Sequence, residues 1–157
     1  MITHFKPTLT KSLPSLAMPT LHTALAPLLP SKQHSFLSVR VDGVFNQVAF
    51  RVMPAPHRDR QPPSDLSTRQ QLQSVHNVPG LVFGFWSPGC SNGFHVAGFH
   101  LHFISDDRTA GGHVTGFDAW DVQLSAGVLK EYRVEIPQDE DYLELPIRNY
   151  EEDQNLH

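Results

Sequence analysis

The 157-residue sequence contains a single cysteine, Cys90, and charged residues make up only 18% of the chain. One thiol excludes an intrachain disulfide and is typical of proteins from a reducing compartment. Lysine and arginine form no cluster and the formal net charge is −4, so nucleic acid and anionic membranes are not expected partners. No apolar run approaches the roughly 20 residues that cross a bilayer.

The N-terminus also lacks the continuous apolar stretch of a secretory signal peptide, because polar and proline residues interrupt MITHFKPTLTKSLPSLAMPT. We therefore expect a cytoplasmic protein. The hydrophobic fraction of 39% is that of an ordinary globular domain with a core of its own. The oligomeric state is left open by the sequence, and a homodimer is one of the alternatives.

The segment before residue 36 is rich in proline, serine and threonine. We predict residues 1–35 as an N-terminal segment that is partly disordered, and residues 36–157 as one β domain. Within the first segment, TLHTALAPLL has helical periodicity and predicts a short helix that ends before residue 30. The apolar face of this helix comprises Leu21, Leu25, Leu28 and Leu29.

Most of the later chain alternates between apolar and polar residues, the pattern of half-buried strands. Two such runs flank Asp42-Gly43, a pair that favours a tight turn, so we predict a hairpin there. A helix from Ser64 or Asp65 to about Val75 is predicted after a proline-rich loop. Further strands are predicted in LVFGFW, VAGFHLHFI, HVTGFDAWDVQL and LKEYRVEI, with turns at residues 111–112 and 125–127. The expected fold class is α+β, mainly antiparallel β, with a sheet or partial-barrel core and one or two short helices.

Three of the histidines have the spacing of a metal site in GFHLHFISDDRTAGGHV. His100 and His102 lie two positions apart on a predicted strand, so their imidazoles share one face and the apolar neighbours take the other. If the following loop closes symmetrically, His113 lies opposite Ile104 on that same face. Three neutral nitrogen ligands with an open fourth position are how catalytic zinc is held. We predict one Zn²⁺ bound by these histidines, with ordinary strand histidines as the alternative.

Arg51 is a second candidate, because it lies in a strand whose face, with Phe45, Ala49 and Met53, looks half-buried. A guanidinium binds a carboxylate through a planar fork, so an inward arginine near a metal suits an anionic substrate. On the residues alone, a solvated or structurally paired arginine is the preferred interpretation.

Other polar and aromatic residues near these candidates are assigned structural roles. Asp106 and Asp107 could be ligands or bases, but in a DDRTAGG turn they are expected to cap the turn. His95 has the opposite parity to the histidine pair and should point away from it. Trp86 and Trp120 are expected in the core or in a pocket wall.

The run GFWSPGCSNGFHVAGFHLHFISDDRTAGGHV, residues 84–114, resembles the signature region of the α-acetolactate decarboxylases. In that family a GF-x-x-P segment leads into V-x-G-[FY]-H-x-H-F, an S-D-D-R turn and G-G-H-V. Weaker similarity extends upstream through VRVDGVFNQVAFRVMP and downstream to the predicted strand that ends at Pro137. The resemblance implies that His100, His102 and His113 are the three zinc ligands and that Arg51 is the active-site arginine.

The family activity implied is the zinc-dependent decarboxylation of (S)-2-acetolactate to (R)-acetoin, a step in acetoin and butanediol formation. The implied partner is a small 2-hydroxy-3-oxo acid, whose hydroxyl and carbonyl oxygens zinc would chelate and whose carboxylate Arg51 would orient. As carbon dioxide leaves, the resemblance implies an enediolate that is stabilised by the metal and protonated on one face.

The family pattern also includes an N-terminal portion with one active-site glutamate and a second glutamate near the C-terminus. The first has no counterpart here, and only Glu151 or Glu152 could be the second, so we expect a truncated homologue. The sequence therefore predicts weak or absent decarboxylation by this chain alone despite bound zinc. Two alternatives stay open: a cupin-type metal oxygenase or isomerase that uses Asp106, and a zinc-binding relic without catalysis.

Overall fold

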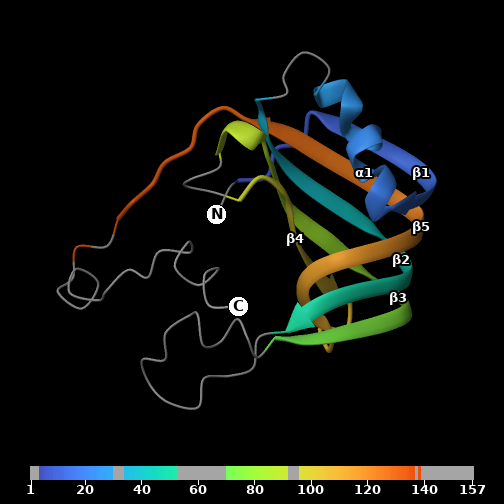
Figure 1. The fold of residues 1–157 in the computed structure, drawn as a ribbon. Helices are drawn as coiled ribbons and strands as arrows, with labels where there is room; N and C mark the ends of the chain where they lie inside the picture. Colours follow the sequence, from blue (N-terminus) through green and yellow to red (C-terminus); the bar gives the residue numbers. More distant parts are fainter. Residues whose placement is uncertain (1–3, 30–33, 53–69, 92–95, 137, 139–157) are drawn as a thin grey trace, which may run out of the picture.

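The computed structural model of the chain describes residues 4–29, 34–52, 70–91, 96–136 and 138. Most of these residues lie in five strands, and one α-helix and two short 3-10 helices complete the regular structure of the described part (Figure 1). In chain order the elements are β1 (Leu9–Ala17), α1 (Met18–Leu25), η1 (Ala26–Leu28), β2 (Phe36–Val52), β3 (Gln71–Ser87), η2 (Gly89–Ser91), β4 (Gly98–Ser105) and β5 (Gly111–Leu129).

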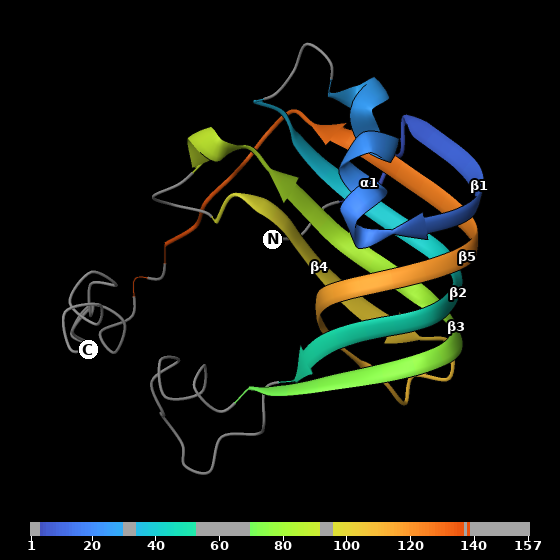
Figure 2. The same cartoon turned by 45° about the vertical axis from the view of Figure 1, so that its right-hand side comes forward.

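The strands form one antiparallel sheet in the order β1-β5-β2-β3-β4, and β4 pairs with β5 as well. This additional pairing closes β2, β3, β4 and β5 into a ring. The strand β1 pairs with β5 between Asp118 and Ala126, beyond the part of β5 that pairs with β4. Figure 2 shows how strongly β2, β3 and β5 bend to close it. The fold class expected from the sequence, mainly antiparallel β with a barrel-like core, is confirmed.

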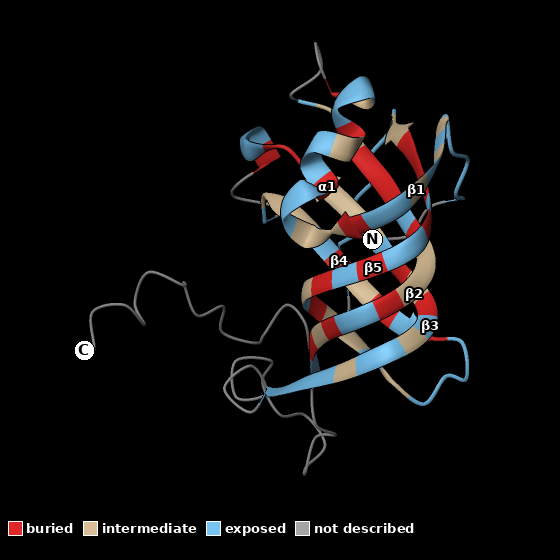
Figure 3. Cartoon of the chain, turned by 90° about the vertical axis from the view of Figure 1, so that its right-hand side faces the viewer, coloured by how far each residue is buried: buried red, intermediate tan, exposed pale blue. Residues whose placement is uncertain are grey.

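The core lies inside this ring and consists of alternate residues of each strand. Figure 3 shows buried and exposed bands following one another along β2 and β5. Aromatic rings fill the centre: Phe45 contacts Phe103 edge to face with centroids 5.2 Å apart, and Phe50 lies 5.8 Å from the same ring. Each of these three side chains is at most 2% exposed to solvent. Burying apolar area of this size is the main stabilising contribution to such a domain.

The hairpin predicted at Asp42-Gly43 is wrong, because β2 runs straight through both residues. Asp42 pairs with Leu81 of β3, Gly43 pairs with Gly80, and neither Asp42 nor Gly43 has the positive φ of a tight hairpin turn. The register of β2 against β5 shifts between Asp42 and Val44. Asp-Gly therefore marks a bulge that bends a long strand, and bulges of this kind are what barrel curvature requires.

Three further local predictions fail. Residues 125–127 continue β5 instead of forming a turn. A side chain at position 127 would clash, because a Cβ there would lie 2.6 Å from the Lys6 carbonyl oxygen. Residues 130–136 belong to no strand in the described part, although LKEYRVEI alternates. The helix predicted up to Val75 is also wrong beyond residue 70, since β3 begins at Gln71; residues 64–69 lie outside the described residues.

The N-terminal segment contributes the expected helix and an unexpected strand. Leu21 and Leu25 of α1 are fully buried, which agrees with the predicted apolar face. The strand β1 pairs with β5 from Leu9↔Ala126 to Ala17↔Asp118. The division of the chain at residue 35 stays a prediction. Within the described ranges, no helix has the length and apolar character needed to cross a membrane.

Candidate metal centre

The strand β4 presents two histidines on the outer face of the barrel. Leu101 and Phe103 point inward and are 1% and 2% exposed, whereas His100 is exposed and His102 is half-buried. The alternation inferred from the sequence is therefore confirmed. Cross-strand pairing then sets the third histidine, because His113 of β5 is the direct partner of His102.

The turn between β4 and β5 differs in register from the symmetric closure that we expected. Ile104 pairs with Gly111 rather than with His113, so the loop is shorter. Its ends are held by the Ser105 N–H, which donates to the Ala110 carbonyl at 2.9 Å, and by the Asp107 carboxylate, which accepts from the Ser105 hydroxyl at 2.6 Å. The register changes by an even number of residues, so the face of His113 was predicted correctly even though its partner was not.

The three imidazoles converge on a common point. The Nε2 atoms of His100 and His102 lie 3.1 Å apart, and one nitrogen from each of the three histidines falls within 4.8 Å of the others. The rings of His100 and His113 are 4.8 Å apart between centroids, and those of His102 and His113 are 5.5 Å apart. Two tetrahedral ligands at zinc–nitrogen distances of about 2.05 Å would be separated by roughly 3.3 Å. The His100–His102 separation matches this value and the third nitrogen lies within 4.8 Å of both, so the three histidines could hold a metal ion.

The protonation state of the cluster also suits a metal. Burial lowers the pKa of His102, and burial, the neighbouring His102 and the charge of Arg51 all lower the pKa of His113. Each of these effects disfavours the imidazolium form. The neutral imidazole is the form that binds metal ions, so the lowered pKa values of His102 and His113 favour metal binding.

Arg51 flanks this cluster on the next strand. It is the direct partner of His113 in the β2–β5 pairing and is exposed, not half-buried as its sequence neighbours suggested. The reason is the register shift between Phe45 and Gln47: Phe45, Val48 and Phe50 are all buried, so the inward–outward alternation has already reversed before Arg51. Among the described residues the Arg51 guanidinium makes no ion pair, whereas Arg40 is held by Asp42.

The remaining candidates separate clearly from the cluster. Among the described residues, the group that could hold a metal contains the three histidines and not Asp106, which disfavours the cupin alternative. Asp107 caps its turn as predicted, since it also accepts from Thr109, and these hydrogen bonds lower its pKa. Trp86 packs on Phe99 with ring centroids 4.8 Å apart. Trp120, expected in the core or a pocket wall, is instead 49% exposed, and His95 lies outside the described residues.

Phe83 beside the cluster was missed in the sequence analysis, and Ile104 was placed on the histidine face without being given a role. Phe83 of β3 pairs with His102 and is 43% exposed, and Ile104 of β4 is 37% exposed. Both lie on the outer face together with the histidines. The signal was present in the alternation, because Phe83 has the opposite parity to the buried Val82.

Gly84 allows β3 and β4 to approach closely behind the cluster. A Cβ at this position would overlap the carbonyl oxygen of His100, and the Gly84 φ angle of +155° favours glycine. We expect Gly84→Ala to lower the free energy of unfolding by roughly 3 kcal/mol, because it combines overpacking with backbone strain. Urea denaturation measures this change.

Gly116 of β5 offers the matched control, since a Cβ there meets nothing within 4 Å. We expect Gly116→Ala to change the unfolding free energy by no more than about 0.5 kcal/mol. Equal losses in the two variants would show that close approach of the backbone at Gly84 is not the cause.

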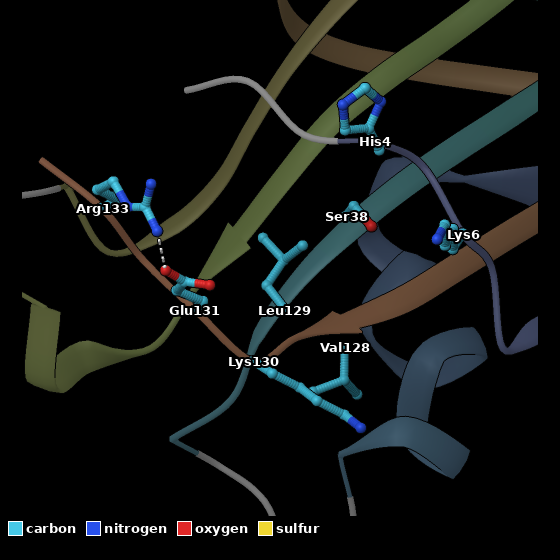
Figure 4. Close-up of a pocket in the computed structure, with 8 residues that line it drawn as sticks. All are labelled: His4, Lys6, Ser38, Val128, Leu129, Lys130, Glu131 and Arg133. Carbon is cyan, nitrogen blue, oxygen red and sulfur yellow. Dashed lines mark hydrogen bonds and ion pairs between the residues drawn. The ribbon is translucent and has the colours of Figure 1, made fainter.

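A separate pocket of about 750 Å³ lies at the ends of β2 and β5 that are far from the histidine cluster. Figure 4 shows it at the beginning of β2 and the end of β5, whereas Arg51 and His113 lie at the end of β2 and the beginning of β5. Its Arg133 is paired with Glu131 at 2.8 Å. The pocket therefore contributes no residue to the histidine cluster. It is lined by His4, Lys6, Ser38, Val128, Leu129, Lys130, Glu131 and Arg133.

Comparison with known proteins gives one consistent result. The sequence profile of the family described as Alpha-acetolactate decarboxylase matches residues 1–149. The alpha-acetolactate decarboxylase of Streptococcus thermophilus is 37% identical over 109 residues, 69% of this chain and 45% of that protein. That of Brevibacillus brevis is 30% identical over 143 residues, 89% of this chain and 49% of the relative.

The solved structures agree with the sequences. The crystal structure of alpha-acetolactate decarboxylase from Bacillus subtilis strain 168 superimposes with a TM-score of 0.83 at 26% identity, covering 98% of this chain and 65% of that one. The chain spans about half the length of the curated relatives that it matches.

Proposed function

This chain belongs to the α-acetolactate decarboxylase family, and we propose that it decarboxylates 2-acetolactate to acetoin at a zinc ion held by His100, His102 and His113. The observation that carries the proposal is the convergence of one nitrogen from each histidine within 4.8 Å. Membership of this family supports 2-acetolactate as the substrate in the proposal. A cytoplasmic setting and a homodimeric assembly stay predictions.

The three histidines would leave part of the ion's coordination sphere open to substrate oxygen atoms. Zinc bound there supplies Lewis-acid stabilisation of negative charge that develops on a substrate oxygen as carbon dioxide leaves. The imidazoles are held on adjacent strands rather than on loops, which preserves their spacing. Rigid placement of this kind favours charge stabilisation without reorganisation during the reaction.

Arg51 would bind and orient the substrate carboxylate. Its position opposite His113 brings a guanidinium to the side of the cluster, and no ion pair within the described part of the chain competes for it. A guanidinium offers two parallel N–H donors to a carboxylate, which determines the direction of the group as well as its distance. The breaking carbon–carbon bond would thereby be held in one orientation.

The carbon that loses carbon dioxide must receive a proton. Within the described part of the chain, no carboxylate joins the histidine group, and Glu151 and Glu152 lie outside the described residues. A positioned general acid contributes about 10²–10⁴-fold to a rate. We therefore expect metal-dependent but slow acetoin formation by the 157-residue chain.

The test is acetoin formation from racemic 2-acetolactate by zinc-loaded protein, with chiral analysis of the product and His113→Ala as the control. We expect a rate below that of the Bacillus subtilis relative by about 10²-fold or more, and above that of the control variant. Equal rates for the chain and for His113→Ala would contradict decarboxylation and favour a metal-binding role without catalysis. Fast turnover to one enantiomer would point to an acid supplied by Glu151 or Glu152.

A further inference from the structure

A row of four side chains crosses the outer face of the barrel through the histidine cluster. Phe83 of β3 pairs with His102 of β4, His102 pairs with His113 of β5, and His113 pairs with Arg51 of β2. Direct partners in antiparallel strands project from the same face, and neighbouring strands lie about 4.8 Å apart. The row therefore has an aromatic end, a histidine centre and a cationic end.

The aromatic end is open to a ligand. Phe83 is 43% exposed, and its ring lies 6.2 Å from the ring of His102 at an interplanar angle of 33°. Ile104, two residues along β4 from His102, is 37% exposed and extends the apolar surface on the same face. Phe83 and Ile104 are diagonal neighbours on one face, about 7–8 Å apart, and contiguous exposed apolar surface beside polar groups is a feature of ligand-binding sites.

The positive charge of the row lies at the Arg51 end. Arg40, the partner of Phe83 on its other flank, is neutralised by Asp42, with Nε and Nη2 donating to the carboxylate at 2.7 and 2.6 Å. Within the described ranges, the guanidinium of Arg51, beyond His113, makes no ion pair. A ligand with a carboxylate at one end, oxygen donors in the middle and alkyl groups at the other end matches this order.

We propose that Phe83, together with Ile104, forms an apolar wall that receives the alkyl substituents of the 2-hydroxy acid and thereby selects its chain length and direction. The inference rests on the proposed function, because the histidine centre must hold the metal that binds the oxygen donors. The carboxylate lies toward Arg51 and the alkyl groups lie toward Phe83. Phe83 is then a specificity-determining residue and takes no part in proton or carbon dioxide transfer.

The test uses unreactive 2-hydroxy acids on the zinc-loaded chain, with affinities measured by isothermal titration calorimetry. Glycolate, 2-hydroxyisobutyrate and 2-hydroxy-2-methylbutyrate keep the carboxylate and hydroxyl and differ only in alkyl carbons. We expect the wild-type affinity to rise about fourfold for each added carbon that is buried against the wall. In Phe83→Ala the gain should fall below about twofold per carbon, while glycolate affinity is unchanged.

Leu72→Ala is the matched control, since Leu72 is 70% exposed and pairs with Arg51 at the opposite end of the row. It should retain the full alkyl gain, and Phe83→Leu should retain most of it. Zinc stoichiometry and the far-ultraviolet circular dichroism spectrum check that each variant folds. If the gain in affinity per added alkyl carbon persists in Phe83→Ala, or is absent from the wild type, the proposal that Phe83 forms an apolar wall is wrong, while the proposed function still stands. Failure of every acid, including glycolate, to bind would overturn the proposed function and the orientation together.

Discussion

Replacement of His102 by alanine is expected to remove the bound metal from the chain. His102 occupies the centre of the cluster, since its Nε2 lies 3.1 Å from that of His100 and it is the direct partner of His113. Loss of residues that merely support a ligand costs about 10–100-fold in metal affinity, so loss of a ligand should cost about 100-fold or more. Elemental analysis should find about one zinc per wild-type chain and almost none in His102→Ala.

His76→Ala provides the control for a general loss of histidine. His76 is exposed on β3, pairs with Gln47 and lies outside the cluster. It should keep the full zinc content. A wild-type chain that purifies without zinc and does not take it up, or an undiminished zinc content in His102→Ala, would contradict the assignment of the three histidines as ligands.

The change Arg51→Lys should preserve the fold and the bound zinc but weaken the handling of 2-hydroxy acids. Lysine keeps the positive charge but loses the planar pair of N–H donors that holds a carboxylate. Hydrogen bonds to charged groups contribute about 1.5–3 kcal/mol, which corresponds to roughly 10- to 100-fold in affinity. The measurements are the affinity of zinc-loaded protein for 2-hydroxyisobutyrate and kcat/KM for acetolactate.

Arg133→Lys is the corresponding control, because Arg133 is an exposed arginine in the segment after β5 and pairs with Glu131 at 2.8 Å. It should match the wild type in both measurements. If Arg51→Lys also matches the wild type while the wild type binds the acid, Arg51 has a structural role and the carboxylate is bound elsewhere.

Local sequence patterns predicted the elements that depend on neighbours along the chain. The alternation around His100 and His102 placed both on one face, and the apolar spacing of Leu21 and Leu25 placed both on the buried side of a helix. These predictions hold because strand and helix periodicity is a property of the backbone itself. The same patterns failed at Asp42-Gly43 and at residues 125–127, where turn-forming residues lie inside long strands.

Those failures share one physical cause. A small closed barrel bends its strands sharply, and bulges and glycines serve that bending as readily as they serve turns. Gly43 lies at a register shift, and Gly127 allows the Lys6 backbone to approach β5 closely. A turn and a bend therefore cannot be distinguished until the pairing partners on both sides of the strand are known.

By itself, the sequence determined the mainly antiparallel β class, the shared face of the three histidines and the resemblance of residues 84–114 to a decarboxylase family. Only the tertiary structure decided that His102 faces His113, that a bulge turns Arg51 outward beside them, and that Phe83 flanks them on the far side. The reason is that register joins residues far apart along the chain. Side-chain periodicity determines which face a residue takes, and pairing between strands determines which residues meet there.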